Sequence, residues 1–290
     1  MEYHVELSVV VPTYQSAYHI TAFLDRMRPV LCRYEGRSEL IMVDDGSDDD
    51  TSGVIWSWVQ SCLLRKPAGP ALGEKSTVRG KTRSGGKTTP GGKTAPGAFN
   101  LKLIRLEKNS GQQAAALCGI AAASGTVIVT VDDDLQHRPE DIPRLLEKLS
   151  EGWDLVYGVP RERYGRRFRS IGSAARNLLF LLIFGSRARR IKPTSFRAFT
   201  AELGRSVAGE PEGFLYLSAE FFRRTGRITG IPVAYEHAGE RHSRYPLRKL
   251  FGAFAGILLY CPFFPGKWRE KSGGARWSIA WTKEAGTPCG

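Results

Sequence analysis

Short, unbroken apolar runs recur along this chain and limit the folds open to it. Four of them cover Leu7–Val11, Glu39–Val43, Leu101–Leu106 and Thr126–Val131, and a shorter fifth covers Leu155–Tyr157. Each has the length of a strand, and their continuous apolar character is typical of strands buried on both faces. The runs therefore predict a sheet that is largely parallel and covered by other elements on both sides.

Segments with helical spacing separate these runs. One begins at Ile20, and a second begins at Asp50 or Thr51. An alanine-rich segment covers 112–123, and a fourth helix is expected over Pro139–Leu149. The alternation of strand and helix predicts the α/β class, with a mostly parallel, Rossmann-like central sheet flanked by helices.

Composition supports a folded core and gives little sign of a disulfide framework. Of the 290 residues, 42% are hydrophobic, so the chain can bury a sizeable core. The five cysteines lie far apart and form no C-x-x-C pair, which excludes a zinc module of that type and makes disulfides unexpected. We therefore expect a reducing, cytosolic setting. The first residues lack the pattern of a signal peptide, so none is expected.

Positive charge is concentrated in residues 65–99. This stretch holds eight Lys or Arg residues and one acid, which gives +7 of the net +13. Its glycines, prolines and serines leave too little apolar surface to offset the entropy of ordering, so we expect a disordered basic insertion. Its Gly-Lys-Thr repeats are no phosphate-binding P-loop, because lysines occupy the positions of the required first glycine, 81 and 87.

Polar and acidic clusters follow three of the predicted strands. These are Pro12-Thr13-Tyr14, Asp44-Asp45-Gly46-Ser47 and Asp132-Asp133-Asp134-Leu135-Gln136. Open parallel sheets bind ligands at the carboxyl ends of their strands, and hard divalent cations prefer oxygen ligands. The alternative is that the clusters are solvated turns whose acids complement the next helix dipole.

The ordered motifs resemble the family 2 glycosyltransferases of the GT-A fold. Residues 9–14, 43–47, 109–111 and 132–140 carry the resemblance, which extends over about 7–65 and 100–250. The D-x-D-L-Q-H-x-P-E form of the last motif is similar to the branch that includes dolichol-phosphate mannosyltransferase and the bacterial undecaprenyl-phosphate sugar transferases.

This resemblance implies a nucleotide-sugar donor linked to UDP or GDP, a polyprenyl phosphate acceptor, Mg²⁺ or Mn²⁺, and inversion at the sugar carbon. The lipid phosphate is already anionic, so no strong general base is required. The residues it implies for the nucleotide-sugar are Pro12, Thr13, Tyr14, Val43, Asp45, Asp132 and Asp133. Those for the metal are Asp132, Asp134 and Gln136, and the catalytic set is Asp134, Arg161 and Arg197. The acceptor phosphate is expected at Arg161, Ser195, Arg241, Ser243 and Arg244.

Two later segments suggest contact with a membrane. Residues 161–190 hold nine arginines around the apolar run Leu178–Phe184, the pattern of an amphipathic helix on an anionic membrane surface. The apolar run Phe251–Phe264 is shorter than the roughly 20 residues needed to span a bilayer. We therefore expect a peripheral protein on the cytoplasmic face.

Three parts follow from these patterns. Residues 1–160 form the nucleotide-sugar-binding core, and 161–250 form the acceptor-binding, interfacial part of the same domain. Residues 251–290 hold the apolar run and a polar tail, Gly266–Gly290, that we expect to be disordered.

Two other functions fit parts of the sequence. A GT-A transferase acting on a soluble sugar or polysaccharide would need a carboxylate base, for which Glu212, Glu220 and Glu236 are candidates. A non-enzymatic binder of anionic membrane or nucleic acid would explain the net charge, although more than half of that charge lies in the basic insertion. No specific nucleic acid partner is expected of the transferase.

Overall fold

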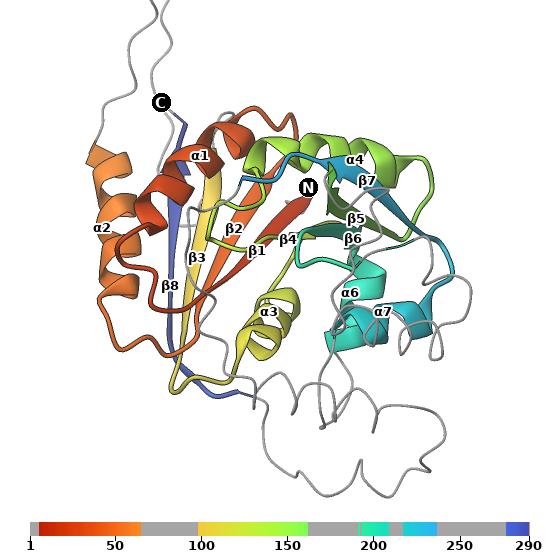
Figure 1. The fold of residues 1–290 in the computed structure, drawn as a ribbon. Helices are drawn as coiled ribbons and strands as arrows, with labels where there is room; N and C mark the ends of the chain where they lie inside the picture. Colours follow the sequence, from red (N-terminus) through yellow and green to blue (C-terminus); the bar gives the residue numbers. More distant parts are fainter. Residues whose placement is uncertain are drawn as a thin grey trace, which may run out of the picture.

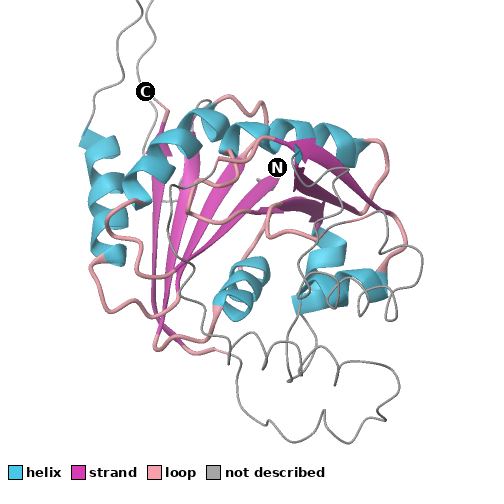
Figure 2. Ribbon diagram, viewed as in Figure 1, coloured by secondary structure: helices cyan, strands magenta, loops and turns pink. Residues whose placement is uncertain are grey.

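A computed structural model describes residues 6–64, 98–161, 191, 193–208, 217–236 and 277–289. These residues form one eight-stranded sheet with helices on both faces (Figures 1 and 2). The strands are β1 (Leu7–Thr13), β2 (Ser38–Asp44), β3 (Ala98–Leu106), β4 (Val127–Thr130), β5 (Leu155–Pro160), β6 (Arg197–Thr200), β7 (Ile228–Val233) and β8 (Ile279–Pro288). The helices are α1 (Ile20–Cys32), α2 (Thr51–Leu64), α3 (Gln112–Ala121), α4 (Ile142–Ser150), α6 (Ala201–Ala208) and α7 (Leu217–Arg224).

The strand order is β7-β5-β6-β4-β1-β2-β3-β8. The central strands β4, β1, β2 and β3 are parallel, with Val9 level with Leu40 of β2 and Val129 of β4. β7 is parallel to β5, whereas β6 and β8 run antiparallel to their neighbours. The expected α/β fold is confirmed, because four of the seven strand pairings are parallel and the continuous apolar runs are the buried central strands.

Successive residues of β1 face opposite sides of the sheet and so contribute to two apolar layers. Val9 and Val11 pack with α1, α2 and α4, whereas Val10 packs with α3, α6 and α7. Figure 1 shows α1 and α4 along one side of the sheet and α3, α6 and α7 along the other. The sheet is therefore buried on both faces, and its strand ends remain as the place for a ligand.

β1 continues past Pro12, where the sequence predicted its end. The carbonyl of Thr13 accepts a hydrogen bond from Asp45 of the β2 side, so Pro12 turns its backbone toward β4. The last bond on that side runs from Val131 N–H to the Val10 carbonyl, because Pro12 has no N–H to continue the ladder. Pairing with β2 does not use the N–H of Pro12, and the strand therefore reaches Thr13. The helix expected from Pro139 likewise starts as a 3₁₀ turn over Pro139–Asp141 before α4.

The expectation of a disordered tail over Gly266–Gly290 is wrong for residues 277–289. They form β8, which pairs antiparallel with β3 along the edge of the sheet, Lys283 opposite Leu103. An edge strand is stabilised by its partner's unpaired backbone groups, which the local composition of the tail does not reveal. At the other end of the same pairing, β3 begins at Ala98, so the last two residues assigned to the basic insertion belong to the sheet.

A disulfide between Cys32 and Cys289 ties β8 to the end of α1, contrary to the expectation from the scattered cysteines. The two residues are 257 positions apart in sequence, and only the fold brings them together. Beside the bond, the Arg28 guanidinium donates to the Pro288 carbonyl at 2.8 and 3.2 Å. Disulfides are rare in reducing compartments, so this bond gives no support to the expected cytosolic setting.

Several predictions fall outside the described residues. These concern the disorder of 65–97, the arginine-rich segment over 162–190, the acceptor residues Arg241, Ser243 and Arg244, and the apolar run Phe251–Phe264. Within the described part of the chain, no helix combines the length and apolar character needed to cross a bilayer.

Candidate functional site

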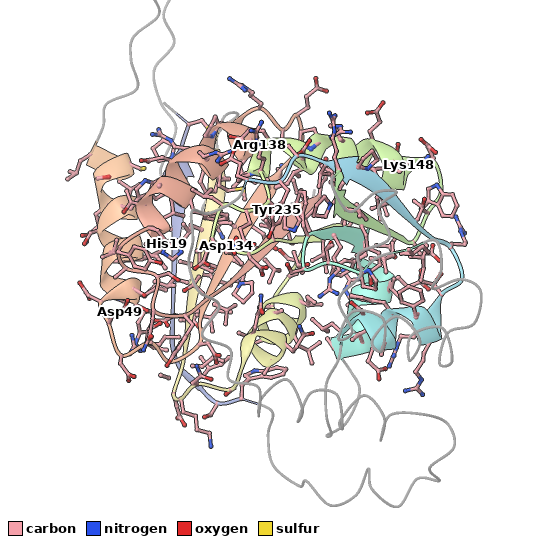
Figure 3. All side chains as sticks on the ribbon, in the orientation of Figure 1. His19, Asp49, Asp134, Arg138, Lys148 and Tyr235 are labelled. Carbon is pink, nitrogen blue, oxygen red and sulfur yellow. A yellow bond between two sulfur atoms is a disulfide. The ribbon has the colours of Figure 1, made fainter. Side chains whose placement is uncertain are left out.

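The loops that follow β1, β2 and β4 meet at the carboxyl edge of the central sheet. The third of these loops holds Asp132 to Gln136, and Figure 3 shows half-buried Asp134 near the middle of the view, with His19 and Tyr235 labelled on either side. The three polar clusters predicted from the sequence therefore gather at one edge, as the carboxyl ends of parallel strands must.

Asp132 is held by two neighbours. Its carboxylate accepts a hydrogen bond from the Gln112 side-chain amide at 2.6 Å and another from the Ser195 hydroxyl. Burial raises the pKa of Asp132 to about 6, and the charges of Asp134 and Asp133 add to this rise against the effect of the two hydrogen bonds. The loop thus carries more negative charge than its surroundings stabilise, and a cation would relieve it.

Asp133 joins the β4 loop to the β1 loop. The Ser16 hydroxyl donates to its carboxylate at 2.5 Å, and His19 Nε2 lies 3.6 Å from the other carboxylate oxygen. Asp133 is buried. Sequence reasoning missed His19, because a single histidine before a helix belongs to no motif. Its place beside Asp133 follows from the packing of α1.

The turn after Asp134 shapes the rest of the loop. Asp134 accepts the backbone N–H of Gln136 at 3.0 Å, and Leu135 between them has a φ of 59°. This left-handed conformation is uncommon for a residue with a side chain, and it reverses the chain within two residues. The Tyr235 hydroxyl donates to the side-chain oxygen of Gln136.

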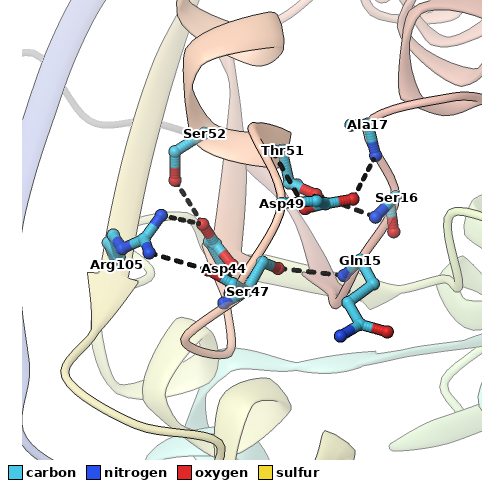
Figure 4. A network of polar contacts seen from close by, with 9 residues as sticks. All are labelled: Gln15, Ser16, Ala17, Asp44, Ser47, Asp49, Thr51, Ser52 and Arg105. Carbon is cyan, nitrogen blue, oxygen red and sulfur yellow. Dashed lines mark hydrogen bonds and ion pairs between the residues drawn. The ribbon is translucent and has the colours of Figure 1, made fainter.

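Asp44 and Asp45, at the end of β2, make different contacts. Asp44 is fully buried and accepts hydrogen bonds from the Ser47 N–H at 2.9 Å, from Ser52 Oγ and from Arg105 at 3.1 Å. Figure 4 shows this cluster, in which Asp44 serves the structure of the loop rather than a ligand. Asp45 instead accepts backbone N–H groups of the 110–111 loop, and burial raises its pKa.

The start of α2 is clamped to the β1 loop through backbone donors, as Figure 4 also shows. Gln15 N–H donates to Ser47 Oγ at 2.9 Å, and Ser16 N–H donates to Thr51 Oγ1 at 2.8 Å. Asp49 accepts the N–H groups of Ala17 at 3.2 Å and Thr51 at 3.1 Å. Burial would raise the pKa of Asp49, but these hydrogen bonds and that of the Thr51 hydroxyl lower it. The two loops therefore form one unit.

Arg197 lies beneath this edge and is almost fully buried. It donates to Thr130 Oγ1 at 3.1 Å and to Ser218 Oγ at 3.2 Å, and its guanidinium lies 5.0 Å from the centre of the Phe221 ring. Among the residues that the structure describes, Arg197 forms no ion pair with a carboxylate. It lines a small pocket whose other lining residues are Pro12, Gln112, Gln113, Ala116, Thr130, Val131, Asp132 and Ser195.

The remaining predicted residues occupy unequal positions. Tyr14 is 42% exposed beside the site, and Thr13 is buried. Val43 is also fully buried, with its side chain in the layer against α3, so a ligand could reach it only through the backbone. Arg161 follows β5 in an exposed position, and no contact between described residues joins it to the pocket.

The donor set suits a hard divalent cation. Asp132, Asp134 and the Gln136 amide offer oxygen atoms, which Mg²⁺ and Mn²⁺ prefer. Among the residues that the structure describes, no three His, Cys, Asp or Glu side chains converge as a metal centre. The fit therefore depends on the crowded carboxylates of this loop and on Gln136.

The sheet and its strand-end loops have the arrangement of the GT-A fold. Glucosyl-3-phosphoglycerate synthase from Mycobacterium tuberculosis, solved with UDP, superposes with a TM-score of 0.57 at 20% identity, over 91% of this chain and 82% of that one. A mannosyltransferase from Pyrobaculum calidifontis, solved with GDP-Man and Mn²⁺, gives a TM-score of 0.51 at 19% identity. The superposition covers 83% of this chain and 59% of the mannosyltransferase. At these identities the likeness shows the fold.

Sequence comparison finds a family model that matches part of the chain, and relatives that match most of it. Residues 93–208 match the model of glycosyl transferase family 2. The undecaprenyl-phosphate 4-deoxy-4-formamido-L-arabinose transferase of Serratia proteamaculans (strain 568) is 26% identical over 258 residues, 87% of this chain and 67% of the relative. The enzyme of the same name from Klebsiella pneumoniae (strain 342) is 27% identical over 256 residues, which cover 87% of this chain and 66% of the relative. The chain spans about two thirds of the length of these relatives.

The match over residues 93–208 and the curated relatives support a glycosyltransferase of family 2, as the motifs indicated, and so an enzyme. They favour this reading over that of a non-enzymatic basic binder.

Proposed function

We propose that this chain transfers a sugar from a nucleotide-sugar donor to a polyprenyl phosphate, with Mg²⁺ or Mn²⁺ held by Asp132, Asp134 and Gln136. The observation that carries the proposal is that Asp132, the first residue of the Asp132–Gln136 loop, lines one pocket at the sheet edge together with Ser195 and buried Arg197. Solved structures of the same fold contain UDP or GDP-Man together with Mn²⁺, which supports a donor of this kind.

The acceptor is proposed from the relatives and from the state of the acidic residues. The relatives are named for transfer to undecaprenyl phosphate. A soluble hydroxyl acceptor would need a carboxylate base. Glu220 is buried and paired with Arg223 and Arg224, so it is poorly placed to take a proton.

Glu236, the other described candidate for a base, is also engaged. Its carboxylate pairs with Arg26 at 3.1 Å and Arg138 at 2.7 Å. The third candidate, Glu212, lies outside the described residues. A phosphate acceptor is anionic and needs no such base, so these pairings favour a lipid phosphate over a sugar hydroxyl.

Each residue is given a proposed role that its position supports. Ser195 and Gln112 orient the Asp132 carboxylate, and Asp134 and Gln136 complete the oxygen donors for a cation. When bound, that cation would neutralise the charge of the departing nucleoside diphosphate. Arg197 supplies a second, fixed positive charge below the same pocket.

A direct displacement by the acceptor phosphate from the opposite face of the sugar would invert the sugar carbon. The arginine-rich segment after Arg161 would place the acceptor at an anionic membrane surface. We propose the cytoplasmic face, where nucleotide-sugars are available to a peripheral enzyme.

The test is transfer of labelled sugar from a panel of UDP- and GDP-sugars to undecaprenyl phosphate, with Mg²⁺, Mn²⁺ or EDTA. We expect metal-dependent labelling of the lipid, lost in Asp134→Ala. Glu151→Gln, a change of an exposed acid at the end of α4, is the matched control and should leave transfer intact. Full activity of Asp134→Ala, or labelling of soluble acceptors with lipid phosphate inert, would overturn the proposal.

A further inference from the structure

The end of β7 is docked directly on the loop that carries the proposed metal ligands. Glu236 N–H donates to the Gln136 carbonyl at 2.9 Å, and Tyr235 forms an isolated antiparallel bridge with His137. The Tyr235 hydroxyl then reaches back to the side-chain oxygen of Gln136. Two segments about 100 residues apart in sequence thus share backbone and side-chain contacts at the same residue.

Contacts from α4 and its first turn fix the backbone leading to Tyr235. The Asp141 carboxylate accepts the N–H of Ala234 at 3.1 Å. Arg144 bonds both to Asp141 at 2.7 Å and to the Pro232 carbonyl at 2.9 Å. The chain therefore arrives at Tyr235 with little freedom to move away from the loop.

Glu236, the next residue, is fixed by charge. Arg138, from the loop itself, and Arg26, from α1, both pair with its carboxylate, and Arg26 also binds Glu140 at 2.8 Å. A partly buried network of this kind is worth more than an isolated surface pair, because each arginine orients the same acid.

The ring of Tyr235 is held as well as its backbone. It packs edge-on against His137, with 5.3 Å between ring centres, and His137 in turn lies 5.2 Å from the Phe196 ring. His137 is buried. The tyrosine hydroxyl is therefore presented to Gln136 by a rigid support.

We propose that Tyr235 is a positioning residue that sets the metal affinity of the site by fixing the side chain of Gln136. This inference rests on the proposed function, in which Gln136 is a metal ligand. A glutamine has three rotatable bonds, and ordering it on metal binding costs conformational entropy. The hydrogen bond from Tyr235 orders it beforehand, and partners of metal ligands commonly change affinity by about 10- to 100-fold.

The experiment measures binding of Mn²⁺ alone, from the electron paramagnetic resonance signal of the free ion. Tyr235→Phe should weaken binding by about 10-fold or more. Tyr34→Phe removes a hydroxyl near the start of β2, at the opposite edge of the sheet, and should bind as the original protein does. Unchanged or tighter binding by Tyr235→Phe would overturn the inference.

A double-mutant cycle separates positioning from a general structural effect. In a Gln136→Ala background there is no side chain left to fix, so Tyr235→Phe should have no further effect on Mn²⁺ binding. A further loss of similar size would show that Tyr235 acts on the loop in another way and would sink the proposal.

Asp134→Ala distinguishes failure of the inference about Tyr235 from failure of the proposed function. If Asp134→Ala abolishes Mn²⁺ binding while Tyr235→Phe binds normally, only the role of Tyr235 is lost. If Asp134→Ala binds Mn²⁺ as tightly as the original protein, the proposed metal site is wrong, and the inference falls with it.

Discussion

The carboxylate of Asp45 accepts the backbone N–H of Gly111 at 2.8 Å and so ties the end of β2 to the start of α3. The N–H of Ser110 donates to the same carboxylate at 2.7 Å. Both donors belong to the turn before the helix, where backbone groups have no helical partner. A side chain predicted to hold a nucleoside thus also holds the loop beside it.

Asp45→Ala should destabilise the protein and loosen this loop. It leaves two backbone N–H groups without their acceptor, which costs about 1–3 kcal/mol for a buried group. Urea unfolding followed by circular dichroism measures the loss. Asp48→Ala removes an exposed acid three positions along and should change the unfolding free energy by about 0.5 kcal/mol or less. Equal effects of the two changes would contradict the assigned contact.

Gly46→Ala should disrupt the turn after β2. Gly46 has a φ of 65°, and a Cβ there would lie 2.6 Å from the backbone of Lys108. The left-handed conformation alone costs about 1–2 kcal/mol for a residue with a side chain. A fall in melting temperature is expected, together with weaker nucleotide-sugar binding. Gly286→Ala, where nothing lies within 4 Å, is the control and should be close to neutral.

The Arg26–Glu140 pair should make stability depend on pH. Burial acts to raise the pKa of Glu140, but the hydrogen bond and charge of Arg26 outweigh it and lower the pKa from its ordinary 4.5. The folded state then binds fewer protons than the unfolded state, so the stabilisation is complete above about pH 4.5 and is lost as the pH falls through the lowered value.

Glu140→Gln should therefore be less stable at pH 7, by less than about 1 kcal/mol because the pair is partly exposed. In thermal melts from pH 7 down to pH 3, the melting temperatures of the two proteins should become equal at the acid end. A constant difference across that range would argue against the ion pair.

Loss of the Cys32–Cys289 bond should release β8. Cys289→Ser should lower the melting temperature of the oxidised protein, with about 2–4 kcal/mol typical for a native disulfide. Peptide mapping under non-reducing conditions should find Cys32 linked to Cys289. A reducing agent should lower the stability of the original protein but not that of Cys289→Ser. Identical melts of both proteins under oxidising conditions would exclude the bond.

Strands and strand-end motifs could be predicted because their signals are local. The run Leu7–Val11 and the cluster at Asp132 each show their role within a few residues, and a parallel sheet then brings their ends together. β8 could not be predicted this way, because its stability comes from the edge of β3 rather than from its own composition.

Within the site, the motif residues could be predicted from the sequence, but the residues that contact and position them could not. The sequence indicated Asp133 and Gln136, but no pattern indicated His19 or Tyr235. These two reach the loop from α1 and from the end of β7, and such contacts depend on how distant elements pack.

By itself, the sequence determined the α/β class, the positions of the buried central strands along the chain and the oxygen donors at their ends, because periodicity and motif chemistry are written in neighbouring residues. Only the tertiary structure decided that the tail completes the sheet, that Cys32 meets Cys289, and that Tyr235 supports Gln136. Each of these needs chain segments distant in sequence to meet, and that proximity is created by burial of the core as a whole.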